Sequence, residues 1–209
     1  MGLDMYLVKK DNFKSIEWLT PQEEEKENKY DKRIVVTSTD GTKRTAYAFT
    51  IRNIETTQGE TIHVWELEQI TSNGIVIKVY NEDADNESER ILRMVIPFSD
   101  IKTISYEYAY WRKANQIHDW FVRTVQDGVD DCGGYDVTYE QLEDLKDLCR
   151  QVLGKKGNTE FADATLPTCA GFFFGGTEYD DDYYEDLQNT LDQLSEIKEG
   201  QLFTYCSSW

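Results

Sequence analysis

Several features that mark exported, metal-binding or membrane proteins are scarce in this chain of 209 residues. It has three prolines, two histidines and four cysteines, and no Cys-x-x-Cys pair occurs. Its longest apolar runs, such as 94–98 and 170–174, are far shorter than the ~20 residues that cross a bilayer. No basic stretch leads into an apolar one near the N-terminus. We therefore expect a cytoplasmic protein without membrane contact, with reduced thiols and no structural zinc.

Positive charge is also scarce. The chain has 22 Lys and Arg against 40 Asp and Glu, a net charge of −18. Residues 126–209 carry 19 acidic and five basic side chains, so −14 of this charge lies there. Direct binding to nucleic acid is not expected, because phosphate neutralisation needs a basic surface. The excess acid is either an ordinary solvated surface or a face that attracts a basic partner.

Runs of β-branched and aromatic residues fill the first half of the chain. Alternation at Leu3, Met5 and Leu7 predicts a strand near the N-terminus. Asp40–Gly41 and Asn73–Gly74 are typical of hairpin turns, because these residues tolerate a positive φ. These patterns together predict an antiparallel meander. Its further predicted strands lie at 34–37, 47–51, 62–67, 75–80, 91–96 and 100–106, with a last strand at 202–206.

The pattern becomes helical after Tyr108. Apolar residues at helical spacing from Tyr110 to Phe121 predict one helix. A capping box of Thr138 and Gln141 predicts the start of a second helix, ending at Gly154, and residues 180–197 form a third. A short polar surface helix is expected at 20–27. The sequence thus predicts an α+β fold, in which an antiparallel sheet of hairpins packs with about three α-helices in a single domain, 1–209. Residues 109–200 form its helical, acidic half.

One candidate pocket lies on the predicted 110–121 helix. Trp111, Asn115 and His118 fall on one stripe, where Trp could stack a planar ligand and His118 could act as donor or base. The alternative is structural: Asn115 and His118 bond backbone groups of a loop, and Arg112 pairs with a carboxylate. The candidate binding residues of this block are Tyr110, Trp111, Arg112, Lys113, Asn115 and His118.

Acidic and aromatic residues suggest two further sites. Carboxylates of the 127–131 loop and of residues 180–186 could together hold Mg²⁺ or Ca²⁺. However, aspartates at a helix start are stabilised by the helix dipole without any metal. We therefore predict no cofactor, metal ligand or catalytic residue, and keep a divalent cation as the alternative. Aromatic residues among acids are typical anchors of protein interfaces. The binding residues predicted on this ground are Tyr179, Asp181, Asp182 and Tyr183.

Four segments resemble a family of small, uncharacterised proteins of bacteriophages and prophages. They are the start MGLDMYL (1–7), the YWRKANQIHDWF block (110–121), the LPTCAGFFFGGTEYD run (166–180) and the final SSW (207–209). The resemblance implies a bacterial host cytoplasm but no established activity. Some members carry a phosphoglycerate kinase label, yet this chain has about half that enzyme's length and lacks its two-lobed α/β pattern. Residues 33–80 depart from the family and are expected to be a β-hairpin insertion.

Three functions follow as hypotheses. The first is a non-enzymatic phage or prophage accessory protein that binds and modulates a host macromolecule, such as a basic nucleic-acid-binding or defence protein, through an acidic surface that imitates DNA. The second is a small-molecule or nucleotide-binding protein, including a metal-dependent hydrolase, that uses Trp111 to His118. The third is a structural subunit that associates with itself. The oligomeric state stays open.

Overall fold

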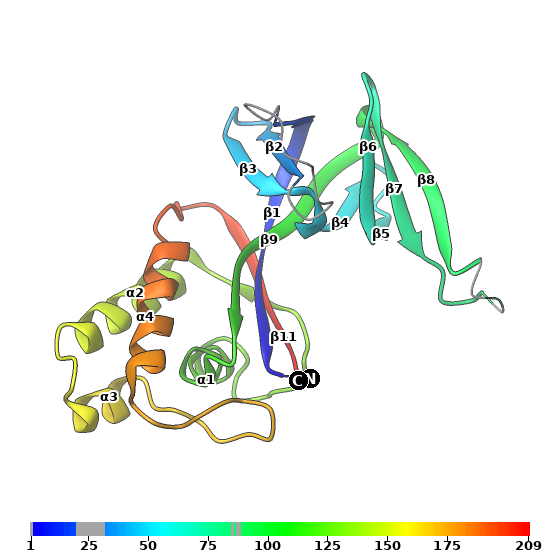
Figure 1. Cartoon of the computed structure of the whole chain (residues 1–209). Coiled ribbons are helices and arrows are strands. Elements are labelled where there is room, and N and C mark those ends of the chain that lie inside the picture. Colours follow the sequence, from blue (N-terminus) through cyan, green and yellow to red (C-terminus); the bar gives the residue numbers. More distant parts are fainter. Residues whose placement is uncertain (1, 20–31, 85, 87–88) are drawn as a thin grey trace. The chain divides into compact units, whose positions relative to one another are not determined.

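The predicted α+β class is confirmed by a computed structural model that describes residues 2–19, 32–84, 86 and 89–209. This part contains antiparallel strands and four α-helices (Figure 1). It divides into two compact units. The first unit comprises Met1–Lys9 and Tyr108–Trp209, and the second unit comprises Lys10–Glu107. The helix predicted at 20–27 lies outside the described residues.

The second unit is built from strands. Two long strands, β1 (Asp4–Trp18) and β9 (Ile101–Arg112), contribute residues to both units. Within the second unit, β1 pairs with β2, β2 with β3, and β4 with both β5 and β9, all antiparallel. A separate sheet has the order β6-β7-β8. The remaining strands are β2 (Arg33–Ser38), β3 (Lys43–Tyr47), β4 (Ile51–Thr56), β5 (Thr61–His63), β6 (Glu66–Ile70), β7 (Gly74–Tyr80) and β8 (Ile91–Pro97).

Both predicted hairpins form, but only one uses a positive φ. Gly41 joins β2 to β3 with φ of 85°. Gly74 is instead the first residue of β7, and a Cβ there would lie 2.6 Å from the Ile96 carbonyl oxygen of β8. Glycine at 74 therefore allows two strands to approach closely. The strand predicted at 47–51 is wrong in part, since Ala48–Thr50 form a 3₁₀ turn between β3 and β4.

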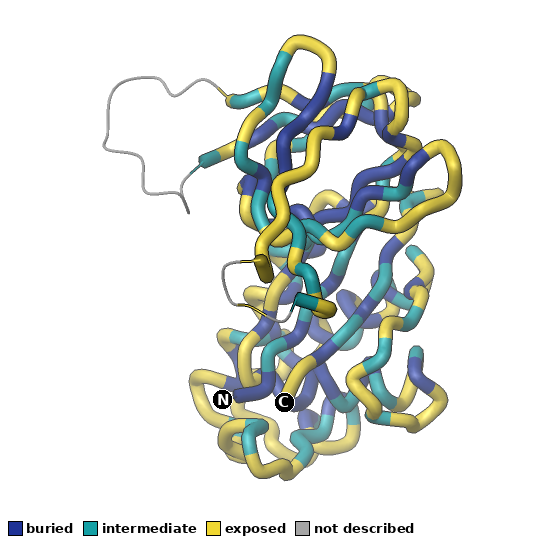
Figure 2. Tube along the Cα trace, turned by 90° about the vertical axis from the view of Figure 1, so that its right-hand side faces the viewer, coloured by how far each residue is buried: buried dark blue, intermediate teal, exposed yellow. Residues whose placement is uncertain are grey.

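The first unit combines a sheet of order β10-β11-β1-β9 with all four helices (Figure 1). Its apolar core includes Phe121, Leu142, Leu145 and Leu187, all fully buried. Figure 2 shows this burial along the chain trace, with buried strand segments and exposed turns. The elements are β10 (Tyr135–Val137), β11 (Leu202–Ser208), α1 (Asn115–Thr124), α2 (Tyr139–Leu153), α3 (Thr159–Thr165) and α4 (Asp181–Gln193).

The helix predicted from Tyr110 is wrong over its first turn. Strand β9 continues to Arg112, and α1 begins only at Asn115. Ala109 and Trp111 are buried while Tyr110 and Arg112 are exposed, which is the two-residue period of a strand. Lys113 then adopts φ of 60°, which turns the chain from strand into helix. Aromatic residues favour strands, so the helical spacing of Tyr110 and Ala114 is coincidental.

Two further boundaries differ from the sequence prediction. Helix α4 ends at Gln193 rather than near 197. The additional helix α3 lies in a segment predicted as loop, where the Asn158 side chain caps it by accepting from the Phe161 N–H at 3.1 Å. The predicted insertion at 33–80 lies wholly inside the second unit. Both this insertion and the single domain stay predictions, because a compact unit is not by itself an independent domain.

Two predicted general properties can be compared with the described residues. All four cysteines are free thiols. Among the described helices, none is long and apolar enough to cross a membrane.

The capping box at the start of α2 generates a prediction. The Thr138 hydroxyl accepts from the Gln141 N–H at 3.2 Å, and the Gln141 side chain accepts from the Thr138 N–H at 2.9 Å. Thr138→Ala should therefore lower the free energy of unfolding by about 1 kcal/mol, measured by urea denaturation. Thr124→Ala, the same exchange at an exposed position of α1, is the control. Equal effects of the two changes would contradict a capping role.

Candidate functional site

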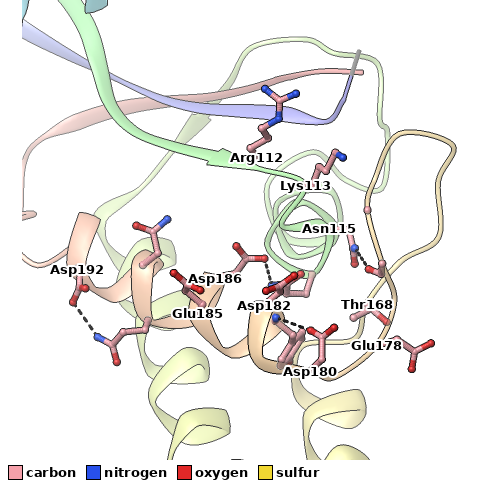
Figure 3. Close-up of a pocket in the computed structure, with 16 residues that line it drawn as sticks. Arg112, Lys113, Asn115, Thr168, Glu178, Asp180, Asp182, Glu185, Asp186 and Asp192 are labelled. Carbon is pink, nitrogen blue, oxygen red and sulfur yellow. Dashed lines mark hydrogen bonds between the residues drawn. The ribbon is translucent and has the colours of Figure 1, made fainter. Parts of the chain in front are cut away.

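A hollow of about 730 Å³ lies in the first unit beside α4 (Figure 3). Its walls come from the end of β9, the start of α1, the loop after α3, and α4. Only two cationic side chains line it, Arg112 and Lys113. The carboxylates that line it are Glu178, Asp180, Asp182, Glu185, Asp186 and Asp192. The hollow is therefore strongly acidic.

Helix α4 arranges most of these carboxylates. Asp182, Asp186 and Asp192 recur at spacings that keep them near one face of a helix. The opposite face enters the core through Tyr183 and Leu187. At the helix start, the Asp180 side chain accepts from the Tyr183 N–H at 3.2 Å, and negative charge there is favourable. The amphipathic pattern of α4 thus directs most of its acids toward the hollow.

Asp186 is the most perturbed acid of the hollow. It is half-buried, and the Gln116 amide, itself only 2% exposed, donates to it at 3.1 Å. Burial raises the pKa of Asp186 to about 6, and the negative charges of Asp182, Glu185 and Asp180 add to this effect, while Gln116 opposes it. Asp182 and Asp186 face α1 in Figure 3. A cation entering the hollow would be attracted by this charge.

Trp111 does not belong to a ligand pocket. Its indole is 1% exposed, packs within the core of the first unit, and donates to the Thr190 hydroxyl at 2.9 Å. Because β9 extends through Arg112, Trp111 does not share a helical stripe with Asn115 and His118. Its ring is therefore not available to stack a planar ligand.

Asn115 braces the loop that forms one wall of the hollow. Its buried side chain donates to the carbonyls of Phe174 and Gly176 at 3.2 and 2.7 Å, and accepts from the Cys169 N–H at 2.9 Å. This is the structural role proposed as the alternative from the sequence. Gly175 lies directly against Lys113. Its φ of 92° favours glycine, and a Cβ at position 175 would lie only 3.1 Å from the Lys113 Cβ.

His118 lies away from the hollow. It is 1% exposed, with Nδ1 2.7 Å from the Tyr205 hydroxyl and Nε2 3.1 Å from a carboxylate oxygen of Asp130. The other oxygen of Asp130 accepts from the Trp209 indole at 3.2 Å. The predicted hydrogen bonds of His118 to loop backbone are therefore replaced by side-chain hydrogen bonds, of which the one to Tyr205 is buried and links α1 to β11.

The remaining predicted residues of the block are at its edge. Arg112 lies 3.8 Å from the Asp4 carboxylate. The Tyr110 hydroxyl also donates to Asp4, and its backbone exchanges two hydrogen bonds with the Gln193 side chain. Burial and then Asp4 raise the pKa of Tyr110 to about 12. Lys113 lines the hollow.

The predicted acidic and aromatic binding residues are dispersed. Asp182 is exposed and lines the hollow, whereas Asp181 points elsewhere and pairs with Lys156 at 2.9 Å. Tyr183 is 3% exposed, and its hydroxyl donates to the Leu166 carbonyl at 2.8 Å. The Tyr179 hydroxyl donates to Asp163 at 2.6 Å beside a second, shallower hollow. The tyrosines expected to be surface anchors are thus mostly engaged internally.

The acids do not form a compact cluster. Across the described ranges, no group of three or more His, Cys, Asp or Glu is arranged to hold a metal ion. Asp131, expected on such a site, instead accepts from the Tyr135 hydroxyl and the Gly133 N–H. The predicted absence of a cofactor and its alternative, a divalent cation, both stay predictions. The carboxylates of the hollow are spread along α4, which suits an extended cationic partner better than a single ion.

Sequence reasoning missed Gln116, Glu178 and Asp192, which line the hollow. The spacing of acids along α4 could have placed Asp192 on the same face as Glu185, seven residues earlier. Gln116 and Glu178 carry no local signal, because only the folded chain brings them to α4. No family model, curated protein or solved structure matches this chain. The geometry alone therefore supports the functional argument.

The raised pKa of Asp186 predicts a pH-dependent stability. A carboxyl whose pKa is higher in the folded state stabilises the fold when protonated. This contribution is present below the unfolded pKa of about 3.8 and is lost as the pH rises through about 6. Asp186→Asn, which stays neutral, should therefore be more stable than the wild type at about pH 7.5, and this advantage should disappear at about pH 4. Urea unfolding at several pH values measures it.

Asp192→Asn is the control for Asp186→Asn, because it removes an exposed carboxylate of the same hollow. An equal gain in both variants would show that overall charge, rather than the burial of Asp186, causes the effect. Carboxyl ¹³C NMR should place the titration midpoint of Asp186 near 6. A midpoint at the ordinary aspartate value would contradict the burial argument.

The bracing role of Asn115 generates a further prediction. Asn115→Ala leaves the Phe174 and Gly176 carbonyls and the Cys169 N–H without this partner, and should destabilise the protein by about 2–4 kcal/mol. It should also speed amide hydrogen exchange at Cys169. Asn189→Ala, at an exposed position of the hollow, should have little effect on either. An unchanged rate of amide hydrogen exchange at Cys169 in Asn115→Ala would contradict the bracing role.

Proposed function

We propose that this protein is a non-enzymatic binding protein, which uses the acidic face of its first unit to engage a basic surface of a host macromolecule. The observation that carries the proposal is the hollow beside α4, which is lined by six carboxylates and two cationic side chains. Opposite charge on a partner gives long-range attraction and a fast, salt-dependent association. The partner is accordingly a protein rich in Lys and Arg.

The charge density of α4 supports imitation of a nucleic acid. From Asp180 to Asp192 this segment carries six carboxylates over about 18 Å, given a rise of about 1.5 Å per helical residue. One carboxylate per ~3 Å is close to the phosphate spacing of about 3.4 Å along one DNA strand. Asp181 is paired with Lys156 and Asp186 has a raised pKa, so the effective charge is somewhat lower. A protein that binds DNA through basic residues would be attracted to such a face.

The same features disfavour the nucleotide-binding alternative. Phosphate groups would be repelled by six carboxylates, and Trp111 and His118 are both 1% exposed and bonded within the first unit. A hydrolase would need a base that reaches solvent or substrate. Asp186, which lines the hollow and has a raised pKa, is the group that would have to serve as this base.

The biological setting of the proposal comes from the sequence resemblance. A phage or prophage protein in a bacterial cytoplasm meets host nucleic-acid-binding and defence proteins, many of which present basic surfaces to DNA or RNA. Occupying such a surface would inhibit the host protein without any chemical step.

Affinity capture from a bacterial lysate tests this function. The wild type should retain a basic host protein in stoichiometric amount at about 0.05 M salt and release it at about 0.5 M, because charge attraction is screened. Native mass spectrometry would measure the stoichiometry and identify the partner. The triple variant Asp182→Asn/Glu185→Gln/Asp192→Asn should lose this capture.

A second triple variant serves as the charge-matched control. Glu66→Gln/Glu68→Gln/Asp100→Asn removes three acids from the second unit and should retain the partner. Equal loss in both variants, or capture that does not respond to salt, would contradict the proposed face. A bound small molecule in place of a protein would favour the alternative function.

A further inference from the structure

The loop between Thr168 and Thr177 carries the most exposed large apolar side chain described. Phe172 is 93% exposed, whereas its neighbours Phe173 and Phe174 are half-buried. A fully exposed phenylalanine buries no apolar area and therefore does not stabilise the fold. Its position therefore calls for another explanation.

The loop holds Phe172 in a defined place. Its base is closed by the Thr168 hydroxyl, which donates to the Thr177 carbonyl at 3.0 Å, and by the three hydrogen bonds of Asn115. At the tip, the Phe174 N–H donates to the Gly171 carbonyl at 3.3 Å. Residues 171–174 thus form a turn with Phe172 at its second position.

The residue next to Phe172 is fixed independently. The Phe173 carbonyl accepts from the Leu3 N–H of the N-terminal segment at 3.1 Å. The Phe173 ring packs edge-on against Phe172, with centroids 4.7 Å apart. Ordering an anchor before binding lowers the entropic cost of association. Phe172 is accordingly a pre-organised, unburied aromatic side chain.

Acids border the loop on both sides. At its beginning, the negative charges of Asp119 and Asp130 act on the Cys169 thiol, where the positive charge of Arg123 opposes them. At its end, Glu178 and Asp180 line the acidic hollow, while Lys113 lies against Gly175. An anionic lipid surface would be repelled by this excess of acids. A protein surface with Lys and Arg around an apolar pocket complements it.

We propose that Phe172 is the anchor through which this protein docks, inserting into an apolar pocket that is bordered by basic residues on the partner protein. This inference rests on the proposed function for the basic character of the partner, and adds the contact that gives specificity. Aromatic anchors surrounded by polar contacts dominate the affinity of many interfaces. The carboxylates then provide attraction, and Phe172 provides the apolar contact.

Selection from a random dodecapeptide display library tests the anchor without knowledge of the partner. The wild type should enrich peptides that combine Lys or Arg with large apolar residues. Phe172→Ser should still enrich basic peptides but lose the apolar component. The triple variant Asp182→Asn/Glu185→Gln/Asp192→Asn should lose the basic component. The two selections thereby separate failure of the anchor from failure of the proposed function.

The most enriched peptide, labelled with a fluorophore, gives the quantitative measurement. Phe172→Ser should weaken its binding by about tenfold or more, since burial of a phenylalanine is lost. Phe49→Ser, at another exposed phenylalanine in the second unit, should leave binding unchanged. Because Phe172 is exposed, its variant should keep the wild-type melting temperature.

Three outcomes would overturn the anchor: equal peptide binding by wild type and Phe172→Ser, no enrichment by the wild type, or Phe172-dependent binding to vesicles of phosphatidylglycerol and phosphatidylethanolamine. The last outcome would assign the loop to a lipid surface. Enrichment of apolar, non-basic peptides that depends on Phe172 would keep the anchor and reject the basic partner.

Discussion

The buried side chain of Asn115 is the interaction on which the candidate site depends. It joins the first turn of α1 to both ends of the loop that walls the acidic hollow and carries Phe172. An amide suits this place because it donates twice and accepts once. A buried group with these bonds satisfied is stable, whereas the same backbone groups without a partner would be costly. One residue thus braces both a wall of the acidic hollow and the loop that carries Phe172.

In the first unit, the side chains that would attract a partner are different from those that pack in the core. Helix α4 buries Tyr183 and Leu187 on one face and directs carboxylates outward on the other. Burial of Asp186 raises its pKa to about 6, so this acid is neutral only at mildly acidic pH. Near neutral pH it is mostly charged, and its burial then costs stability. A bound cation would favour its ionised form and stabilise the complex.

Local patterns predicted much of the fold, and their failures have physical causes. The hairpins, the capping box at Thr138 and the helix after Asp180 follow from turn and capping chemistry, which acts between close neighbours. The segment 110–112 satisfied both a helical and a strand period, and pairing within a sheet selected the strand. Trp111, His118 and Tyr183 were assigned to a surface because a single sequence does not reveal burial.

The sequence by itself determined the α+β class, the negative charge and its concentration in the second half, because composition and short-range periodicity carry this information. Tertiary structure alone decided which polar residues bind each other. The pairs Gln116–Asp186 and His118–Asp130, and the loop held by Asn115, join positions whose contact is set by packing of the whole unit. The same packing buried Tyr183 and left Phe172 exposed, since the core accepts only the side chains that its helices and strands direct inward.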